Sequence, residues 1–169
     1  MRVLLVRHAI AANRHPARWP DDSQRPLTDA GISKFRSAAR GLGSLVPNVD
    51  RLLASPYPRA FDTAQILHEE AAWVAPEPCP QLEAERRPEE TIGLLANDAH
   101  VVALVGHEPL LSAIASLLLT GTSDTVRFTL KKGGAVLLEL PGDAGDVFAN
   151  LQWSLPPKVL RALGRPQGA

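Results

Sequence analysis

The chain has 169 residues, of which 45% are hydrophobic and 21% charged, and these proportions exclude a disordered or fibrous protein. Its 18 Lys and Arg balance 18 Asp and Glu, and this zero net charge argues against general nucleic-acid binding. A single cysteine, Cys79, excludes an intrachain disulfide, and the longest apolar runs are too short for a signal peptide or a membrane span, so we expect a cytoplasmic protein without a membrane partner.

Strands and helices are predicted to alternate along the first 119 residues. The continuous apolar runs at 3–6 and 101–105 are typical of strands buried on both faces. Thr28 can cap a helix whose apolar residues recur at helical spacing. The full set expected here is strands at 3–6, 51–54 and 101–105, helices at 28–46, 58 to about 73, 88–95 and 109–119, a loop at 11–26, and a segment that is extended at best at 74–82.

The last third of the chain predicts mostly antiparallel structure. Residues 125–130 and 135–140 are expected to form a β-hairpin around the sequence KKGG. A strand at 147–155, a short helix at 157–163 and a frayed tail at 164–169 follow. The pattern indicates one α/β domain over residues 1–169. We expect a three-layer α/β/α sandwich whose central sheet is mainly parallel, with antiparallel late strands at its edge.

Positive charge gathers in the first part of the chain. Residues 1–60 carry ten Lys and Arg against four Asp and Glu, whereas residues 61–100 carry two against nine. The basic portion would suit a local site for an anion.

Basic side chains follow three predicted strands at the point where each strand ends. Arg7 and His8 follow the first strand, Ser55 and then Arg59 follow the second, and His107 follows the run at 101–105. Because the carboxyl ends of parallel strands meet at one edge of a sheet, these side chains are expected to share a pocket. Two imidazoles and two guanidiniums repel one another unless an anion joins them, and the arginine fork fits a phosphate. The sequence therefore predicts a phosphate site.

The chemistry expected of such a site is phosphoryl transfer. A neutral imidazole is a competent nucleophile toward phosphorus, and His8 is the residue we assign to that role. Arg7, Arg59 and a protonated His107 would bind the phosphoryl oxygens and neutralise their charge. Since the arginines supply positive charge, we expect neither a metal ion nor another cofactor.

At these residues the sequence resembles the histidine phosphatase superfamily, also called the phosphoglycerate mutase-like group. The Arg7-His8 pair, the stretch SPYPRAFDTA from Ser55 and the sequence VGH ending at His107 carry the resemblance, in this order. Within the superfamily, the stretches RHAIA, DDSQRPLTDAG and WSLPPKVL look most like the small SixA-type phosphohistidine phosphatases. The resemblance implies a metal-independent phosphatase that forms a phosphohistidine intermediate. Its implied substrate is phosphohistidine on a protein, such as a phosphorelay or phosphotransfer carrier.

Two further functions remain open beside this one. Many members of the superfamily use a carboxylate as general acid, and here Glu83 is the candidate, with Glu85 almost as plausible and no acid at all a third possibility. A phosphohistidine leaves as an imidazole, whose conjugate acid has a pKa of about 6.5, and it needs such an acid less than an alkoxide does. A phosphomonoesterase for small metabolites, sugars or acids, is the alternative enzyme. An inactive phosphoprotein-binding module is the alternative of another class.

Several nearby residues have less specific signals. Asn13 could line the pocket from the loop, and Arg25 could either reach the pocket or pair with Asp22. Glu108 lies at a predicted helix start, where a carboxylate is favoured electrostatically. A zinc site is disfavoured, because the chain has one cysteine and no metal-ligand spacing.

Overall fold

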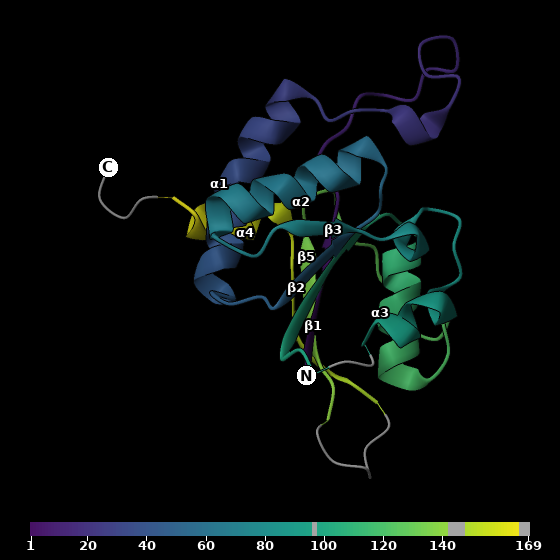
Figure 1. The fold of residues 1–169 in the computed structure, drawn as a ribbon, viewed down its shortest axis with the longest axis vertical. Coiled ribbons are helices and arrows are strands. Elements are labelled where there is room, and N and C mark those ends of the chain that lie inside the picture. Colours follow the sequence, from purple (N-terminus) through teal and green to yellow (C-terminus); the bar gives the residue numbers. More distant parts are fainter. Residues whose placement is uncertain (96–97, 142–147, 166–169) are drawn as a thin grey trace.

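A computed structural model describes residues 1–95, 98–141 and 148–165 of the chain. Its middle layer is a six-stranded sheet with the order β3-β2-β4-β1-β5-β6 (Figure 1). Strands β1 to β4 run parallel, and β5 and β6 run antiparallel to their neighbours at one edge. The strands are β1 (Arg2–Arg7), β2 (Arg51–Ala54), β3 (Pro76–Pro78), β4 (Val101–Gly106), β5 (Ala135–Glu139) and β6 (Asn150–Leu155). The predicted fold class is confirmed.

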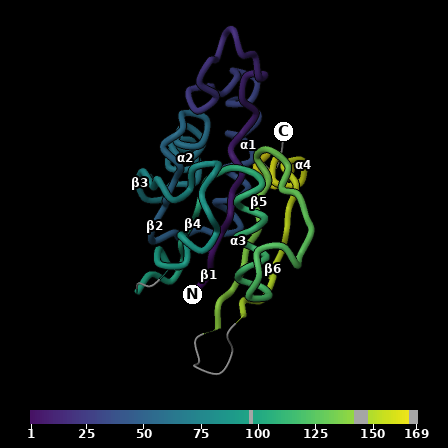
Figure 2. Tube along the Cα trace, turned by 90° about the vertical axis from the view of Figure 1, so that its right-hand side faces the viewer, coloured from purple at the N-terminus to yellow at the C-terminus, as the bar shows by residue number. Residues whose placement is uncertain are grey.

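Helices cover both faces of this sheet. One face carries α1 (Asp29–Leu45), α2 (Pro58–Ala71) and α4 (Pro157–Leu163), and the other carries α3 (Leu110–Thr120), as Figures 1 and 2 show. Three 3-10 helices complete the elements: η1 (Asp22–Gln24), η2 (Pro80–Leu82) and η3 (Pro88–Leu95). Thr28 caps α1 as predicted, since its Oγ1 accepts a hydrogen bond from the backbone N–H of Gly31 at 3.0 Å. Within the described ranges, no helix is both long and apolar enough to cross a bilayer.

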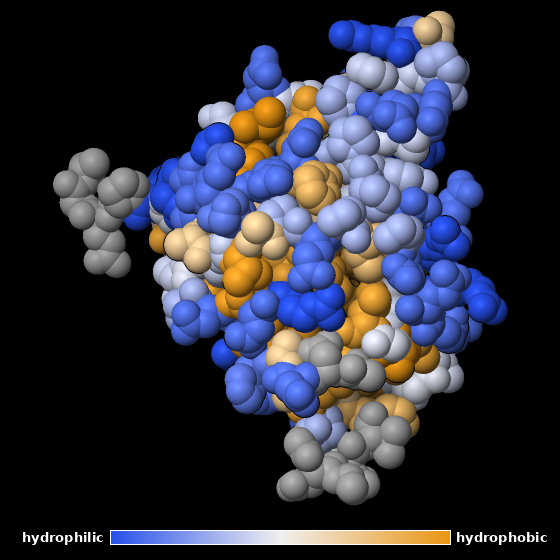
Figure 3. All heavy atoms as spheres, in the orientation of Figure 1, coloured by the Kyte–Doolittle hydropathy of each residue, from blue (hydrophilic) through white to orange (hydrophobic). Residues whose placement is uncertain are grey.

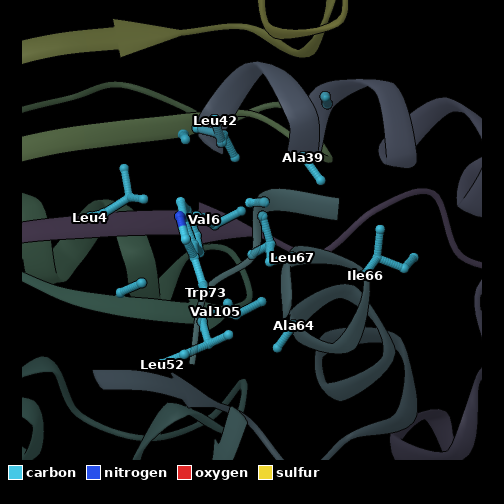
Figure 4. Packing of buried hydrophobic residues seen from close by; sticks show 14 of the residues in the cluster. Leu4, Val6, Ala39, Leu42, Leu52, Ala64, Ile66, Leu67, Trp73 and Val105 are labelled. Carbon is cyan, nitrogen blue, oxygen red and sulfur yellow. The ribbon is translucent and has the colours of Figure 1, made fainter. Parts of the chain in front are cut away.

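The central strand β1 is buried on both faces, which explains its continuous apolar run. Leu4 and Val6 pack with α1 and α2 (Figure 4), and the alternate residues Val3 and Leu5 pack in a second cluster with α3. All four side chains are completely buried. With both faces covered, the carboxyl-terminal edge of the sheet is where β1, β2 and β4 can present polar groups to a ligand.

The hairpin predicted for residues 125–130 and 135–140 is wrong. Residues 125–130 form no strand, and β5 instead pairs with β1 on one side and β6 on the other. The backbone N–H of Leu130 donates to the Glu108 carboxylate at 2.6 Å, and its carbonyl oxygen accepts from Arg7 Nη1 at 2.6 Å. These side chains take the place of a partner strand, and Leu130 packs against the α3 side of the core.

The chain ends also differ in detail from the prediction. Strand β6 begins at Asn150, while Val147 lies outside the described residues. Gly164, assigned to the tail from sequence, is buried, and a Cβ there would lie 1.8 Å from the carbonyl oxygen of Ser37 in α1. Residues 166–169 lie outside the described part. The segment at 74–82 forms β3 at 76–78 as an extended stretch, but it ends in the 3-10 helix η2 at 80–82, and 88–95 is also a 3-10 helix.

The carboxyl ends of β1, β2 and β4 lie side by side. Arg7 is paired with Gly106 and Ala54 with Val105, so the residues that follow these strands start from the same edge. The loop between β1 and α1 projects beyond this edge (Figure 2), and hydrophilic residues dominate its surface (Figure 3). The fold thus gathers the three sequence motifs under one polar loop.

Candidate active site

Four side chains predicted from the sequence line one cavity at this edge. Arg7, His8, Arg59 and His107 lie around a cavity of about 840 Å³. The rings of His8 and His107 have centroids 5.2 Å apart. The exposed fraction is 4% for His8, 3% for Arg59 and 2% for His107, which is unusually low for charged or titratable residues.

The hydrogen bond of His8 leaves one ring nitrogen free for chemistry. Its Nδ1 lies 2.7 Å from the carbonyl oxygen of Ala9, and a carbonyl can only accept, so Nδ1 carries the proton and Nε2 keeps its lone pair. Burial lowers the pKa of His8 to about 3, and the charges of Arg59, Arg7 and Lys132 add to this against the opposing bond to Ala9. At neutral pH the ring is uncharged, as a nucleophile must be.

The backbone around His8 is held from two sides. The N–H of Ala9 donates to Thr63 Oγ1 in α2 at 3.0 Å. The N–H of Gly133 lies 3.1 Å from the carbonyl oxygens of both Arg7 and His8. Gly133 has a φ of 75°, a left-handed conformation that glycine adopts without strain. The turn at 131–134 is therefore fastened to the end of β1.

His107 is positioned by a buried hydroxyl. Its Nε2 lies 2.9 Å from Ser55 Oγ, and the N–H of Tyr57 donates to the same oxygen at 3.3 Å. Ser55 Oγ accepts from Tyr57 and can also donate its own proton to Nε2, and in that arrangement the His107 proton lies on Nδ1. Burial, followed by the charges of His8, Arg59 and Arg7, lowers the pKa of His107 to about 2. The ring is neutral without an anion, and Nδ1–H is the one donor it offers.

Three buried nitrogen atoms of this cavity are unpaired. Throughout residues 1–95, 98–141 and 148–165, the buried side-chain nitrogens and oxygens with no hydrogen-bond partner are Arg7 Nε, Arg59 Nε and His107 Nδ1. Unpaired buried polar groups are rare because each one costs about 1–3 kcal/mol. All three belong to residues around His8, so the site is built to accept an acceptor-rich ligand.

Asp22 holds three arginines of the cavity wall. Its carboxylate lies 3.0 Å from Arg25 Nε, 3.4 Å from Arg59 Nη2 and 3.4 Å from Arg14 Nε. Burial opposes ionisation of Asp22, but the hydrogen bonds and charge of Arg25, with the charges of Arg59 and Arg14, outweigh it and lower its pKa. Arg25 therefore both lines the cavity and pairs with Asp22, and Asn13 lines the cavity as well.

The two candidate acids are separated by the structure. Glu85 lines the cavity, whereas Glu83 is absent from its lining and lies 3.6 Å from Arg86 Nε. The geometry thus favours Glu85 over Glu83. Glu108 also lines the cavity, and its Oε1 accepts from Ser112 Oγ at 2.6 Å in addition to the bond from the Leu130 backbone.

Sequence reasoning did not identify Ser55 as the partner of His107, nor Asp22, Tyr57 and Lys132 among the residues that line the cavity. Lys132 was missed because the sequence analysis assigned it to the turn of the wrongly predicted hairpin. Tyr57 lies inside the stretch SPYPRAFDTA, so its place between Ser55 and Arg59 was a usable signal. In the described part of the chain, no three His, Cys, Asp or Glu side chains are arranged to hold a metal ion.

Comparison with known proteins places these features in a family. The family described as histidine phosphatase superfamily (branch 1) matches residues 3–87. An uncharacterized protein of Picosynechococcus sp. strain PCC 7002 is 34% identical over 145 residues, which cover 80% of this chain and 83% of that protein.

Solved structures of two phosphatases, whose names give different substrates, share the fold. The protein histidine phosphatase SixA complexed with tungstate superposes with a TM-score of 0.80 at 23% identity, over 95% of this chain and 99% of that one. A mycobacterial glucosyl-3-phosphoglycerate phosphatase with inorganic phosphate superposes with a TM-score of 0.72 at 16% identity, over 93% of this chain and 98% of that one. Identities this low establish the common fold and leave the substrate open.

Proposed function

This chain belongs to the histidine phosphatase superfamily, and we propose that it is a phosphatase that removes the phosphoryl group from phosphohistidine on a protein. The observation that carries the proposal is the set of three unpaired buried nitrogens around the neutral ring of His8. A phosphoryl group offers three oxygens, and the nitrogens of Arg7, Arg59 and His107 offer donors to them.

In the first step, the lone pair on His8 Nε2 attacks the phosphorus atom. A bond forms between Nε2 and phosphorus while the bond from phosphorus to the substrate nitrogen breaks. The electron pair of the broken bond stays on that nitrogen, and the substrate ring, protonated beforehand on its other nitrogen by solvent or by Glu85, leaves as a neutral imidazole. Arg7, Arg59 and the Nδ1–H of His107 donate to the phosphoryl oxygens and stabilise their charge during transfer.

In the second step, water attacks the phosphorus atom from the side that the substrate has vacated. Its oxygen bonds to phosphorus, the bond to His8 Nε2 breaks, and the electron pair returns to the ring. The proton of the attacking water passes to a phosphate oxygen or to solvent, and inorganic phosphate leaves. The Ala9 carbonyl keeps the proton of His8 on Nδ1 throughout, so Nε2 is ready for the next cycle.

The chemistry of the leaving group supports phosphohistidine over a phosphate ester. A substrate ring that is protonated on its other nitrogen leaves as a neutral imidazole, whose conjugate acid has a pKa of about 6.5. It needs no further acid in the transition state, whereas an alkoxide does. Glu83, the acid candidate that follows the proline-rich segment, is not among the residues that line the cavity. The cavity is also large enough to admit a side chain carried on another protein.

A phosphomonoesterase for small metabolites is the second candidate. The observation in its favour is Glu85, which lines the cavity and whose carboxyl group could protonate an alkoxide. This pair of functions makes opposite predictions for one substitution.

The test is a panel of four substrates and four enzymes. Phosphohistidine peptide, phosphoramidate, p-nitrophenyl phosphate and a sugar phosphate are each assayed with wild type, His8→Ala, Glu85→Gln and Glu83→Gln. We expect the highest kcat/KM on the peptide, no turnover by His8→Ala, and less than about a tenfold loss on phosphoramidate with Glu85→Gln. Glu83→Gln is the matched control and should resemble wild type on every substrate.

Three outcomes decide against the proposal. A preference for the sugar phosphate, with a loss of about a hundredfold or more on esters in Glu85→Gln, would establish the metabolite phosphatase. Phosphate binding with no turnover and no acid-labile phosphate on His8 would establish an inactive binding module. Loss of activity with a chelator, restored by a divalent metal, would contradict the expected independence of metal.

A further inference from the structure

A second, shallow hollow adjoins the active-site cavity. It lies between the end of β1, the first turns of α1 and the start of α4, and three of its lining residues are cations: Lys34, Lys132 and Arg161. Lys132 lines both the hollow and the active-site cavity. A basic surface therefore runs from the phosphate site outward. No carboxylate is among the residues that line the hollow.

Lys34 differs from the other basic residues on α1. Arg36 and Arg40 of α1 both pair with Glu70 of α2. Lys34, Lys132 and Arg161 have no ion pair or side-chain hydrogen bond among the described parts of the chain. Desolvation, and then the charges of Arg7, Arg25 and Arg59, lower the pKa of Lys132.

The floor of the hollow is apolar and firmly built. Ile10 is 39% exposed there, and Phe35 and Pro157 lie beside it. A Cβ on Gly133 would lie 3.2 Å from the Phe35 ring, so the turn that carries Lys132 packs closely on α1. Because the Gly133 N–H also bonds to the carbonyl oxygens of Arg7 and His8, the hollow is fixed relative to the nucleophile.

Carboxylates also lie in the segment that follows η2, where Arg86 pairs with Glu83 and Glu90, and Arg87 pairs with Glu90. Glu83 follows η2, Glu85 lines the cavity, and Glu89 and Glu90 lie in the first turn of η3. These ion pairs offset much of the negative charge of that segment, whereas the cations of the hollow have no ion pair among the described residues. Such a charge pattern selects orientation and partner more than it adds raw affinity.

On the premise that the protein is the phosphohistidine phosphatase proposed above, we propose that this basic flank, Lys34, Lys132 and Arg161, binds acidic residues of the phosphoprotein next to its phosphohistidine. The carboxylates would pair with the three free cations, and an apolar side chain would pack on Ile10. The substrate class is therefore a phosphohistidine segment with Asp or Glu on the side that faces α1 and α4.

The test compares three short phosphohistidine peptides that differ only in their flanking residues: Asp and Glu, Ser, or Lys. The enzymes are wild type, the double variant Lys34→Glu/Arg161→Glu, and Arg127→Glu, a reversal of an exposed cation remote from the hollow. Lys132 is left unchanged because it lines the catalytic cavity. We expect the wild type to prefer the acidic peptide, and the double variant to lose about tenfold in kcat/KM on it and much of its salt dependence.

The other arms of the experiment make the result specific. Activity of the double variant on phosphoramidate and on the Ser peptide should equal that of wild type, and Arg127→Glu should match wild type on all three peptides. An equal loss on the Ser and acidic peptides, or no loss on either, overturns the proposal. Competition by a single-stranded oligonucleotide as strong as that by the acidic peptide also overturns it, since the flank would then bind polyanions in general.

Failure of the proposed function gives a different signature. If wild type does not hydrolyse phosphoramidate or any phosphohistidine peptide, the catalytic proposal fails. Binding of fluorescent peptides with a non-hydrolysable phosphohistidine analogue, measured by anisotropy, then still reports on the flank. Equal affinity of wild type and the double variant for the acidic peptide would contradict docking on its own.

Discussion

Acidification from pH 7 to pH 5 should destabilise this protein through the two buried histidines. Burial, as the largest cause, lowers the folded-state pKa to about 3 for His8 and about 2 for His107, against an ordinary value of 6.5. Between these values the unfolded chain binds a proton at each ring and the folded protein does not. Stability that both rings contribute above pH 6.5 is therefore lost as the pH falls toward 3.

The size of this effect depends little on the low folded-state pKa values themselves. At pH 5 an unfolded histidine with a pKa of 6.5 is almost fully protonated, and any folded-state pKa below about 4 leaves the buried ring neutral. The loss of unfolding free energy between pH 7 and pH 5 is then about 2 kcal/mol per histidine, or about 4 kcal/mol for the pair. Asp22 and Glu70, whose pKa values are lowered, lose their contributions mainly below this window.

Urea unfolding at pH 7, 6 and 5, without phosphate in the buffer, measures the effect. Wild type should lose about 4 kcal/mol and His8→Gln about 2 kcal/mol, because the variant keeps only the His107 titration. His100→Gln, which replaces an exposed histidine, serves as the control and should follow wild type. A flat wild-type profile, or an equally steep one in His8→Gln, would show that the rings are not held neutral by burial.

Three further experiments test separate parts of the structure. Ser55→Ala should lower kcat/KM at least tenfold and alter the pH profile of activity, because His107 then loses its hydrogen-bond partner. Ser55→Thr should restore part of the activity. An unchanged pH profile in Ser55→Ala would contradict this role. Gly41→Ala should lower the free energy of unfolding, measured in urea, by more than about 2 kcal/mol, since its Cβ would lie 2.1 Å from a carbonyl oxygen of α4. Gly93→Ala, whose Cβ would have no neighbour within 4 Å, should lower it far less. Equal losses would contradict the close packing of α1 on α4. Tungstate should raise the melting temperature of wild type and have little effect on Arg59→Ala, and an equal rise would place the anion elsewhere.

The parts of the site that sequence could predict are those set by local pattern. Each of β1, β2 and β4 is an apolar run that ends in a polar or basic residue, and parallel pairing alone brings such ends together. Arg7, His8, Arg59 and His107 therefore follow from strand assignment and chain order. The hydrogen-bond partner of His8 is the carbonyl group of Ala9, the next residue along the chain. The sequence could not show that this carbonyl points toward the His8 ring.

The missed residues depend on contacts between distant parts of the chain. Residues 125–130 have a strand-like composition, but Leu130 bonds to Glu108 and Arg7, which lie 22 and 123 positions away. No periodicity encodes such a contact, and without it the turn that carries Lys132 reads as the tip of a hairpin. Asp22 is a similar case, since its pairing with Arg59 joins residues 37 positions apart along the chain.

The choice between Glu83 and Glu85 shows a limit of another kind. Both carboxylates lie in a segment without regular periodicity, just after the 3-10 helix η2. In such a segment, a shift of two residues changes whether a side chain faces the cavity or pairs with Arg86, and composition does not fix the direction. The sequence could place an acid near the site and could not say which one.

The same features that make the cavity reactive make it unfavourable in the free protein. Neutral buried rings keep His8 nucleophilic but oppose stability in acid, and the unpaired nitrogens of Arg7, Arg59 and His107 carry the cost of desolvation without a hydrogen bond. A bound phosphoryl group supplies acceptors to all three nitrogens and negative charge to the surrounding cations at once. The binding energy is therefore largest for a ligand that carries its negative charge between these three nitrogens. A phosphoryl group carries such charge on its oxygens during transfer. Under the proposed function, the protein gives up stability in the free state at the position where it would stabilise the transition state.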